Sequence, residues 1–391
     1  MSALGLEAFR RQFPIFKERV YLNSCSQGAL ATGVEQAFHA FLESWHREGS
    51  PWEHWVDETE HLRERFARLI GADAAEVAVM PSASAGINSV ASALSYDGGR
   101  DGVVMGEFEF PTMAQAWLAQ QRRGARIVWA RARGDLLDKE AYDRAIDERT
   151  LIVPATHVCF KNGFRNDLPA LVASCRERGA LLFLDDYQRT GAGALDVQAL
   201  GVDFMVTGCL KYLLGPSGVA FLYVRRDLIE RLEPTITGWF GRVNPFAFSI
   251  DGLDWSASAR RFESGTPPIP NVYGALAGIE LLEAAGLSAI EAQVGELTRR
   301  FVAGALAAGY EVATPGDPAR RGPLVVIRST NAPELVARLK ARNVLGSCRG
   351  DGLRISFHGY NSVSDVEAAL AALEAEAPLV RRAVAPGVRA S

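Results

Sequence analysis

Two stretches decide the fold: LLFLDDYQ at residues 181–188 and TGCLKYLLGPSG at residues 207–218. In the first, four apolar residues run directly into Asp185, Asp186 and Gln188. In the second, Lys211 lies among apolar neighbours shortly after the strand-like segment 204–206. Ligands of open α/β sheets bind beyond the carboxyl ends of the strands, so polar groups placed there predict a binding site.

Each of these polar groups also has an ordinary interpretation. An acid after a strand is often solvated or caps the next helix, and most lysines are surface charges. A desolvated lysine, however, has a lowered pKa and becomes a good imine-forming amine. The glycines around Lys211 allow the backbone to approach a bulky partner closely.

Outward from these stretches, short apolar segments alternate with amphipathic ones. Apolar strands that alternate with helices predict a parallel sheet covered on both faces. A final segment at Val219–Val224 follows its predecessor after a Gly-Pro-Ser-Gly turn, which favours an antiparallel strand. The other strands are expected at Glu76–Met80, Gly102–Met105, Arg126–Ala130, Leu151–Ala155, Leu181–Leu184 and Phe204–Val206.

The character of the chain changes near residue 280. Ala-rich helical segments and isolated strands follow, which predicts a smaller α+β domain. We therefore expect a large domain over residues 20–280 and a small one over residues 281–377 together with residues 1–19. Residues 378–391 are expected to form a loose tail.

Composition narrows the function classes. The chain has 391 residues and a formal net charge of −4 with the two signs well mixed, so no basic stripe indicates nucleic acid or an anionic membrane. The five cysteines lack CxxC spacing, which indicates neither a disulfide framework nor a zinc site. No apolar run approaches a membrane span and no signal-peptide core is found, so a reducing cytoplasm is expected and no metal is expected.

The segment from Leu181 to Val224 resembles the class V aminotransferase family of pyridoxal-phosphate (PLP) enzymes, which includes cysteine desulfurases, isopenicillin N epimerases and kynureninases. The matching pattern is Asp185, Gln188, GVDF at 201–204 and KYLLGPSG at 211–218. The resemblance implies fold type I, with a mostly parallel seven-stranded sheet flanked by helices and a smaller α+β C-terminal domain. It also implies that Lys211 holds PLP as a Schiff base, Asp185 pairs with the pyridine nitrogen, and Gln188 bonds the ring's phenolic oxygen.

Two further segments resemble the cofactor site of the same family. SASAGIN at 82–88 matches the segment that binds the phosphate, which implies cofactor contacts from Ala83 and Ser84 at a helix start. By itself this would be an ordinary strand-to-helix turn. Phe110, in EFPT at 109–112, takes the position of the aromatic residue that stacks on the ring, and a core phenylalanine is the alternative.

The remaining matches concern the substrate and a second subunit. DGLRISFHGYN at 351–361 implies that Arg354 clamps the substrate α-carboxylate, and the YLNSCSQG segment implies Ser26 in the substrate site. GWFG at 238–241 and RRFESGTP at 260–267 imply that Trp239 and Thr266 reach the cofactor of a neighbouring subunit. A homodimer with active sites at its interface follows from this resemblance.

The chain also departs from the family pattern. Leu210 precedes the lysine where relatives often carry His or Tyr, Gly208 stands where a phosphate-binding serine is expected, and Phe160 replaces the desulfurase asparagine. Cys348 precedes Arg354 by only six residues, and a small buried thiol is the favoured interpretation over a persulfide carrier. Cys25 is a weaker candidate.

The resemblance implies an α-amino acid whose amine displaces Lys211 from the cofactor, after which the freed lysine removes the Cα proton. The leading prediction is a side-chain-cleaving lyase acting on a C–S or C–C bond. An aminotransferase or epimerase follows, then a cysteine desulfurase, then a non-catalytic PLP-fold binding protein. A nicotinamide-binding Rossmann enzyme is disfavoured because residues 80–88 lack G-x-G-x-x-G.

Overall fold

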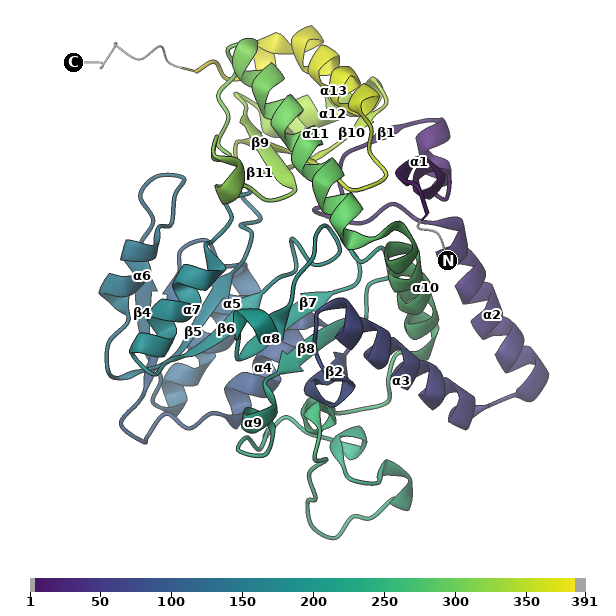
Figure 1. Ribbon diagram of the computed structural model, residues 1–391, viewed down its shortest axis with the longest axis vertical. Helices are drawn as coiled ribbons and strands as arrows, with labels where there is room; N and C mark the ends of the chain where they lie inside the picture. Colours follow the sequence, from purple (N-terminus) through teal and green to yellow (C-terminus); the bar gives the residue numbers. More distant parts are fainter. Residues whose placement is uncertain (1–3, 384–391) are drawn as a thin grey trace.

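The computed structural model describes residues 4–383 and divides into a large sheet with its helices and a smaller C-terminal part (Figure 1). The large sheet has seven strands in the order β2-β8-β7-β6-β5-β3-β4. Only β8 runs antiparallel to its neighbours, because a short loop joins it to β7. The mostly parallel seven-stranded sheet is therefore confirmed. Its strands are β2 (Val77–Met80), β3 (Gly102–Gly106), β4 (Arg126–Ala130), β5 (Thr150–Thr156), β6 (Leu181–Asp185), β7 (Phe204–Gly208) and β8 (Ala220–Val224).

Helices bury both faces of this sheet, as the apolar strands require. Alternate residues of β7 illustrate the two faces: Val206 belongs to one apolar cluster and Met205 to the other. The Val206 face is covered by α4 (Ala83–Ala93) and α5 (Pro111–Leu118). The opposite cluster includes residues of α2 (Thr32–Glu48), α3 (Trp52–Leu69), α6 (Lys139–Ala145), α7 (Leu168–Glu177), α8 (Val197–Leu200) and α10 (Ile269–Ala285).

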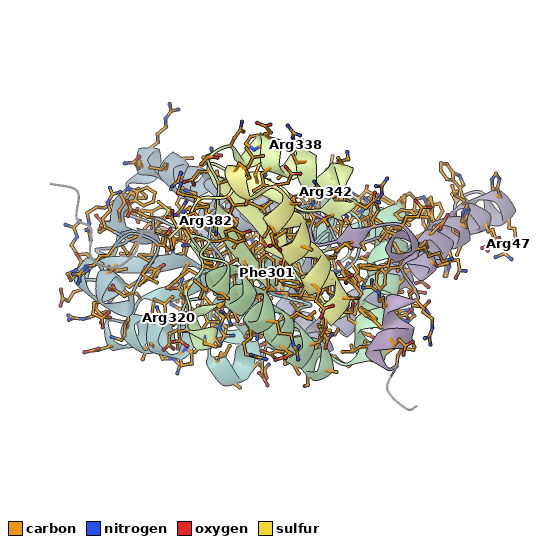
Figure 2. The ribbon with its side chains drawn as sticks, turned by 90° about the horizontal axis from the view of Figure 1, so that it is seen from above. Arg47, Phe301, Arg320, Arg338, Arg342 and Arg382 are labelled. Carbon is orange, nitrogen blue, oxygen red and sulfur yellow. The ribbon has the colours of Figure 1, made fainter. Side chains whose placement is uncertain are left out.

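The C-terminal part is built on an antiparallel sheet of order β11-β12-β9. Phe301 of α11 packs into its apolar core, whereas Arg338 and Arg342 lie exposed on its outer side (Figure 2). These elements are β9 (Leu324–Arg328), β11 (Ser347–Arg349), β12 (Gly352–Ser356), α11 (Leu287–Ala307), α12 (Ala332–Ala341) and α13 (Val363–Ala375). Elsewhere lie α1 (Leu6–Arg10), α9 (Arg226–Ile229) and 3-10 turns at 14–17, 74–76, 119–123, 239–241, 245–247, 259–262, 318–320 and 377–379.

The structure changes the expected boundaries. β1 (Val20–Tyr21), expected in the large domain, pairs with β10 (Val344–Leu345) of the C-terminal part. The helix α10 runs without a break through the expected boundary at residue 280. The expected loose tail is wrong for residues 378–383, because Val380 is buried and bridges to Ser329. The rest of that segment lies outside the described residues.

Among the described residues, no single helix has the length and apolarity to cross a membrane. The helices α10 and α11 are long and apolar enough only when taken together, and they meet at an angle of 80°.

Candidate active site

Asp185 and Lys211 lie at the same edge of the large sheet. Asp185 ends β6 opposite Val206 of the parallel strand β7, and Lys211 follows β7 by three residues. Both side chains are buried, with 7% and 8% of their surface exposed. Burial lowers the pKa of Lys211 to about 8, although the charge of Asp185 opposes this shift. Burial also raises the pKa of Asp185 to about 6, which Lys211 opposes in turn. Adjacent strand ends therefore bring an amine and an acid within mutual influence.

The neighbouring acid, Asp186, is engaged elsewhere. Its two carboxylate oxygens bond to Nδ1 of His157 and to the hydroxyl of Thr190, each at 2.5 Å. Asp185, in contrast, accepts one hydrogen bond, from the backbone N–H of Tyr187 at 3.0 Å. Of the two acids, Asp185 is the one with a free oxygen among the described residues, so it is the one able to bind a cationic ligand atom.

The side-chain amide of Gln188 is fixed through its nitrogen, and its oxygen is left without a partner in the described chain. Its Nε2 donates to the carbonyl of Cys25 at 3.1 Å, while its Oε1 is buried without a hydrogen-bond partner in the described chain. An unpaired buried amide oxygen costs free energy unless a ligand donates to it. Gln188 thus has the capacity to bind a donor group.

Aromatic rings surround the lysine amine. Its Nζ lies 4.1 Å from the ring centroid of Tyr187 and 5.8 Å from that of Phe110. Phe110 remains 42% exposed, and its ring meets the ring of Phe160 edge-on at 5.0 Å. An exposed aromatic face beside the amine is suited to stack on a flat ring.

The helix α4 begins at this same edge of the sheet. The side chain of Ser82 caps it by accepting from the N–H of Ala85 at 3.1 Å. The N–H groups of Ala83 and Ser84 donate to no residue that the structure describes, so they are free to bind an anion. The Ser84 hydroxyl bonds Thr112 at 2.8 Å, which ties this helix start to the segment of Phe110.

Arg354 lies on the C-terminal part and is almost completely buried. Its guanidinium donates to the Phe160 carbonyl at 3.1 Å and to the hydroxyls of Ser26 and Ser347 at 2.7 and 3.0 Å. Its Nε has no partner within the described residues. The contacts hold the fork in place with neutral acceptors, so its charge is available to a carboxylate.

The register of β11 against β12 separates Cys348 from this group. Ser347 pairs with Arg354 and Cys348 with Leu353, whose side chain belongs to the apolar core. Because side chains alternate along a strand, Cys348 faces away from Arg354. Cys25 lies closer, since its thiol influences the pKa of Lys211, but it is 1% exposed.

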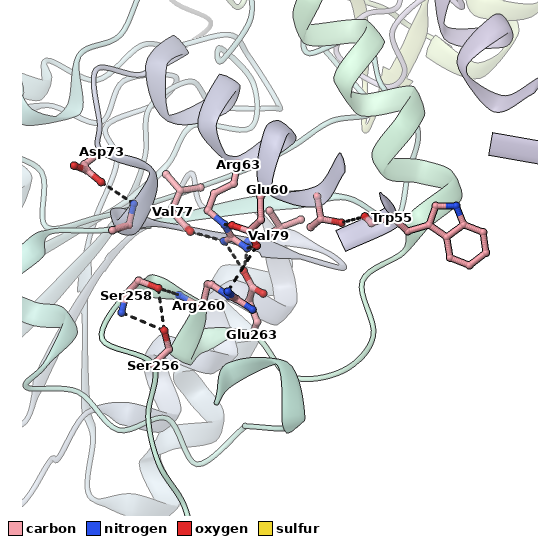
Figure 3. A network of polar contacts seen from close by, with 12 residues as sticks. Trp55, Glu60, Arg63, Asp73, Val77, Val79, Ser256, Ser258, Arg260 and Glu263 are labelled. Atoms are coloured by element: carbon pink, nitrogen blue, oxygen red, sulfur yellow. Dashed lines mark hydrogen bonds and ion pairs between the residues drawn. The ribbon is translucent and has the colours of Figure 1, made fainter. Parts of the chain in front are cut away.

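Within a single chain, Trp239 and Thr266 lie outside the group of residues around Lys211. Both are exposed, and neither contacts Lys211 or Asp185 by a hydrogen bond or ring contact in residues 4–383. Their segments lie side by side, because the N–H of Phe240 donates to the carbonyl of Ser264 at 3.2 Å. Buried Glu263 anchors this region by accepting from Arg63 at 2.6 Å and from the N–H of Val79 at 2.9 Å (Figure 3).

The side chains fit PLP. A buried amine suits an aldehyde, an acid with a free oxygen suits the pyridine nitrogen, and a helix start with free N–H groups suits a phosphate. The unpartnered Gln188 oxygen and the exposed face of Phe110 offer a polar and an aromatic contact to a flat ring. Within residues 4–383, no group of three His, Cys, Asp or Glu is arranged to hold a metal ion.

Fold and site together define an α/β enzyme that uses PLP. The family model described as aminotransferase class V matches residues 32–369, so the chain belongs to that family.

The chain is also similar to individual proteins in sequence and to a solved structure in fold. The chain is 35% identical over 364 residues to "Uncharacterized aminotransferase YcbU" of Bacillus subtilis, covering 93% of this chain and 96% of that protein. It is 30% identical over 384 residues to a kynureninase of Deinococcus radiodurans, covering 94% and 92%. The apo structure of a cysteine desulfurase from Thermococcus onnurineus superimposes with a TM-score of 0.86 at 23% identity, over 96% of this chain and 99% of that one.

Proposed function

We propose that Lys211 binds PLP covalently, that Asp185 holds the pyridine nitrogen protonated, and that Gln188 forms a hydrogen bond with the ring's phenolic oxygen. One observation carries this assignment: the buried amine of Lys211 and the buried acid of Asp185 lie at the ends of the adjacent parallel strands β7 and β6. Ala83 and Ser84 bind the phosphate at the start of α4, and Phe110 stacks on the ring. When bound, PLP accepts the electron pair released as a bond at Cα breaks.

The substrate is proposed to be an α-amino acid. Arg354, oriented by Ser26 and Ser347, binds its carboxylate and so sets which Cα bond stands perpendicular to the ring. Lys211, once displaced by the substrate amine, removes the proton at Cα. Its lowered pKa supports this role, because an amine with a pKa near 8 is a base suited to neutral pH.

The reaction is proposed to be side-chain cleavage at a C–S or C–C bond. The kynureninase relative supports this choice. The register that turns Cys348 away from Arg354 disfavours a desulfurase using that thiol. An aminotransferase or an epimerase uses the same residues and is the second candidate.

A substrate panel tests the reaction type. The PLP-loaded protein would be mixed in single turnovers with L-amino acids including cysteine, cystine, kynurenine and alanine. We expect release of pyruvate, alanine or a thiol from one of them. Stoichiometric pyridoxamine phosphate would instead establish transamination, and loss of sulfur release in Cys348→Ala would establish a desulfurase.

A homodimer is proposed in which Trp239 and Thr266 reach the partner's cofactor. The segment after α9, which extends away from the sheet at the lower edge of Figure 1, exposes apolar residues including Phe248 and Ile250 at 72% and 92%. Exposed apolar surface of this kind favours association. All five cysteines are free, which supports the proposed cytoplasmic location.

A further inference from the structure

Gly208 and Tyr187 fill one space between them. Gly208 ends β7, and a Cβ built on it would lie 2.0 Å from Cε2 and 2.4 Å from the hydroxyl oxygen of Tyr187. No side chain can therefore occur at residue 208 while the ring holds this place. The Tyr187 hydroxyl stands instead where a side chain of residue 208 would begin.

This hydroxyl lies on the face of the sheet that carries α4. Gly208 follows Val206 by two residues, so both point to the same face, and Val206 packs against Gly86 of α4. The helix starts directly after β2, which runs in the same direction as β7 because β8 is antiparallel to both. The first turn of α4 and the Tyr187 hydroxyl therefore meet at one edge of the sheet.

The Tyr187 hydroxyl is available as a donor. It forms no hydrogen bond with any residue that the structure describes, while its ring is held by Gly208 on one side and by the Lys211 amine. Burial raises the pKa of Tyr187, so the hydroxyl stays protonated at neutral pH. An anchored phenol with an unused proton is suited to an anionic oxygen.

We propose that Tyr187 binds the cofactor phosphate, donating its hydroxyl beside the N–H groups of Ala83 and Ser84, and that Gly208 is required to admit its ring. The inference rests on the proposed binding of PLP at Lys211.

The test compares PLP with pyridoxal, which lacks the phosphate, as ligands of the apo protein. Dissociation constants would be measured by absorbance titration. We expect Tyr187→Phe, which keeps the ring, to weaken PLP by roughly 10- to 100-fold, the range for a hydrogen bond to a charged group, and to change pyridoxal by less than about 2-fold. The hydroxyl of Thr207, the residue before Gly208, offers a matched control because it lies on the opposite face of β7. Thr207→Val should leave the dissociation constants of PLP and of pyridoxal unchanged.

A hydroxyl moved to residue 208 gives a second test. Gly208→Ser alone should weaken PLP, because the new side chain meets the Tyr187 ring. In the double variant Tyr187→Ala/Gly208→Ser the space is free, and PLP should bind more tightly than to Tyr187→Ala. Equal losses for PLP and pyridoxal in Tyr187→Phe, or no gain in the double variant, would overturn the inference.

The two proposals fail separately. If borohydride does not attach PLP to Lys211 in the unmodified protein, the proposed function fails. If it does, and Tyr187→Phe binds PLP as tightly as the unmodified protein, only the role of Tyr187 fails.

Discussion

Burial sets the ionisation of single residues in the proposed site. Burial removes Lys211 and Asp185 from water, which lowers the pKa of the amine and raises the pKa of the acid. The charge of each group opposes the pKa shift of the other. The amine is thereby kept reactive near neutral pH without losing its position. Arg354 differs, since neutral acceptors fix its fork and leave its charge for a ligand.

The lowered pKa of Lys211 predicts how fast the apo protein captures PLP. Only the neutral amine attacks an aldehyde, so the capture rate should rise with pH around a midpoint near 8. At pH 7 it should exceed that of an exposed lysine of pKa 10.5 by roughly 300-fold from ionisation alone. Borohydride trapping after timed mixing measures this rate, with Lys211→Ala as the blank.

Asp185→Asn tests the sign of the coupling. The carboxylate raises the pKa of Lys211, so its removal should move the midpoint of the capture profile to lower pH. A midpoint that stays in place or moves to higher pH would show that the two groups do not interact as described.

Arg354→Lys should weaken substrate use and spare the cofactor. Loss of the planar fork is expected to cost about 2 kcal/mol, or roughly 30-fold in kcat/KM for an α-amino acid. The PLP dissociation constant should be unchanged. Arg328→Lys is the matched control, because Arg328 lies in the same small sheet and pairs with Asp135 and Asp351. Equal effects of the two substitutions on kcat/KM would contradict the assignment.

Elements carry these residues to one place through their register and ends. The pairing of Ser347 with Arg354 puts the serine beside the guanidinium and turns the partly exposed Cys348 to the opposite face of the sheet. In the same way, Arg63 of α3 connects the β2 carbonyl of Val77 with Glu263, and so fixes the segment leading to Thr266 (Figure 3).

The Arg63–Glu263 pair should be a strong determinant of stability. Glu263→Ala leaves a fully buried guanidinium with only part of its partners, and breaking such a pair costs about 3–5 kcal/mol. Urea unfolding of the protein measures the change. Arg65→Ala, which removes partly exposed pairs with Glu280 and Glu283, should cost at most about 1 kcal/mol. A loss for Glu263→Ala no larger than this control would contradict the prediction.

At the scale of the whole molecule, the site forms where the two parts of the chain meet. The large sheet supplies Lys211 and Asp185, the C-terminal part supplies Arg354 and Ser347, and the segment after β1 supplies Ser26. The exposed apolar segment after α9 has no such partner within the described residues, and a second copy of the chain is the proposed one.

Charge on that segment should weaken the dimer. Sedimentation velocity is expected to show a dimer for the unmodified protein and a shift toward monomer for Ile250→Asp, since Ile250 is 92% exposed here and would be buried at the interface. Leu306→Asp, at an exposed apolar position on α11, should leave the dimer intact. A monomeric unmodified protein at all concentrations would rule out the proposal.

The sequence alone was sufficient for the sheet and for placing Asp185 and Lys211 at the ends of neighbouring strands. Apolar runs, turn residues and strand-end polar groups are local signals, and they located six strands to within two residues as well as the antiparallel β8. The two-residue strand β1, by contrast, is not marked by an apolar run or a turn. It pairs with β10, a strand over 300 residues away in the chain. The Gly-Asp at 350–351 is a two-residue hairpin signal that could have identified β11 and with it Ser347.

Tertiary structure alone decided which neighbouring groups are already engaged. Asp185 and Asp186 are adjacent in sequence, yet only the Asp186 carboxylate forms hydrogen bonds with His157 and Thr190. Tyr187 and Gly208 show no local pattern, because the complementarity of a ring and a missing side chain exists only after β6 and β7 pair. Strand ends follow from local residue patterns, whereas the direction and partners of a side chain depend on packing between segments distant in the chain.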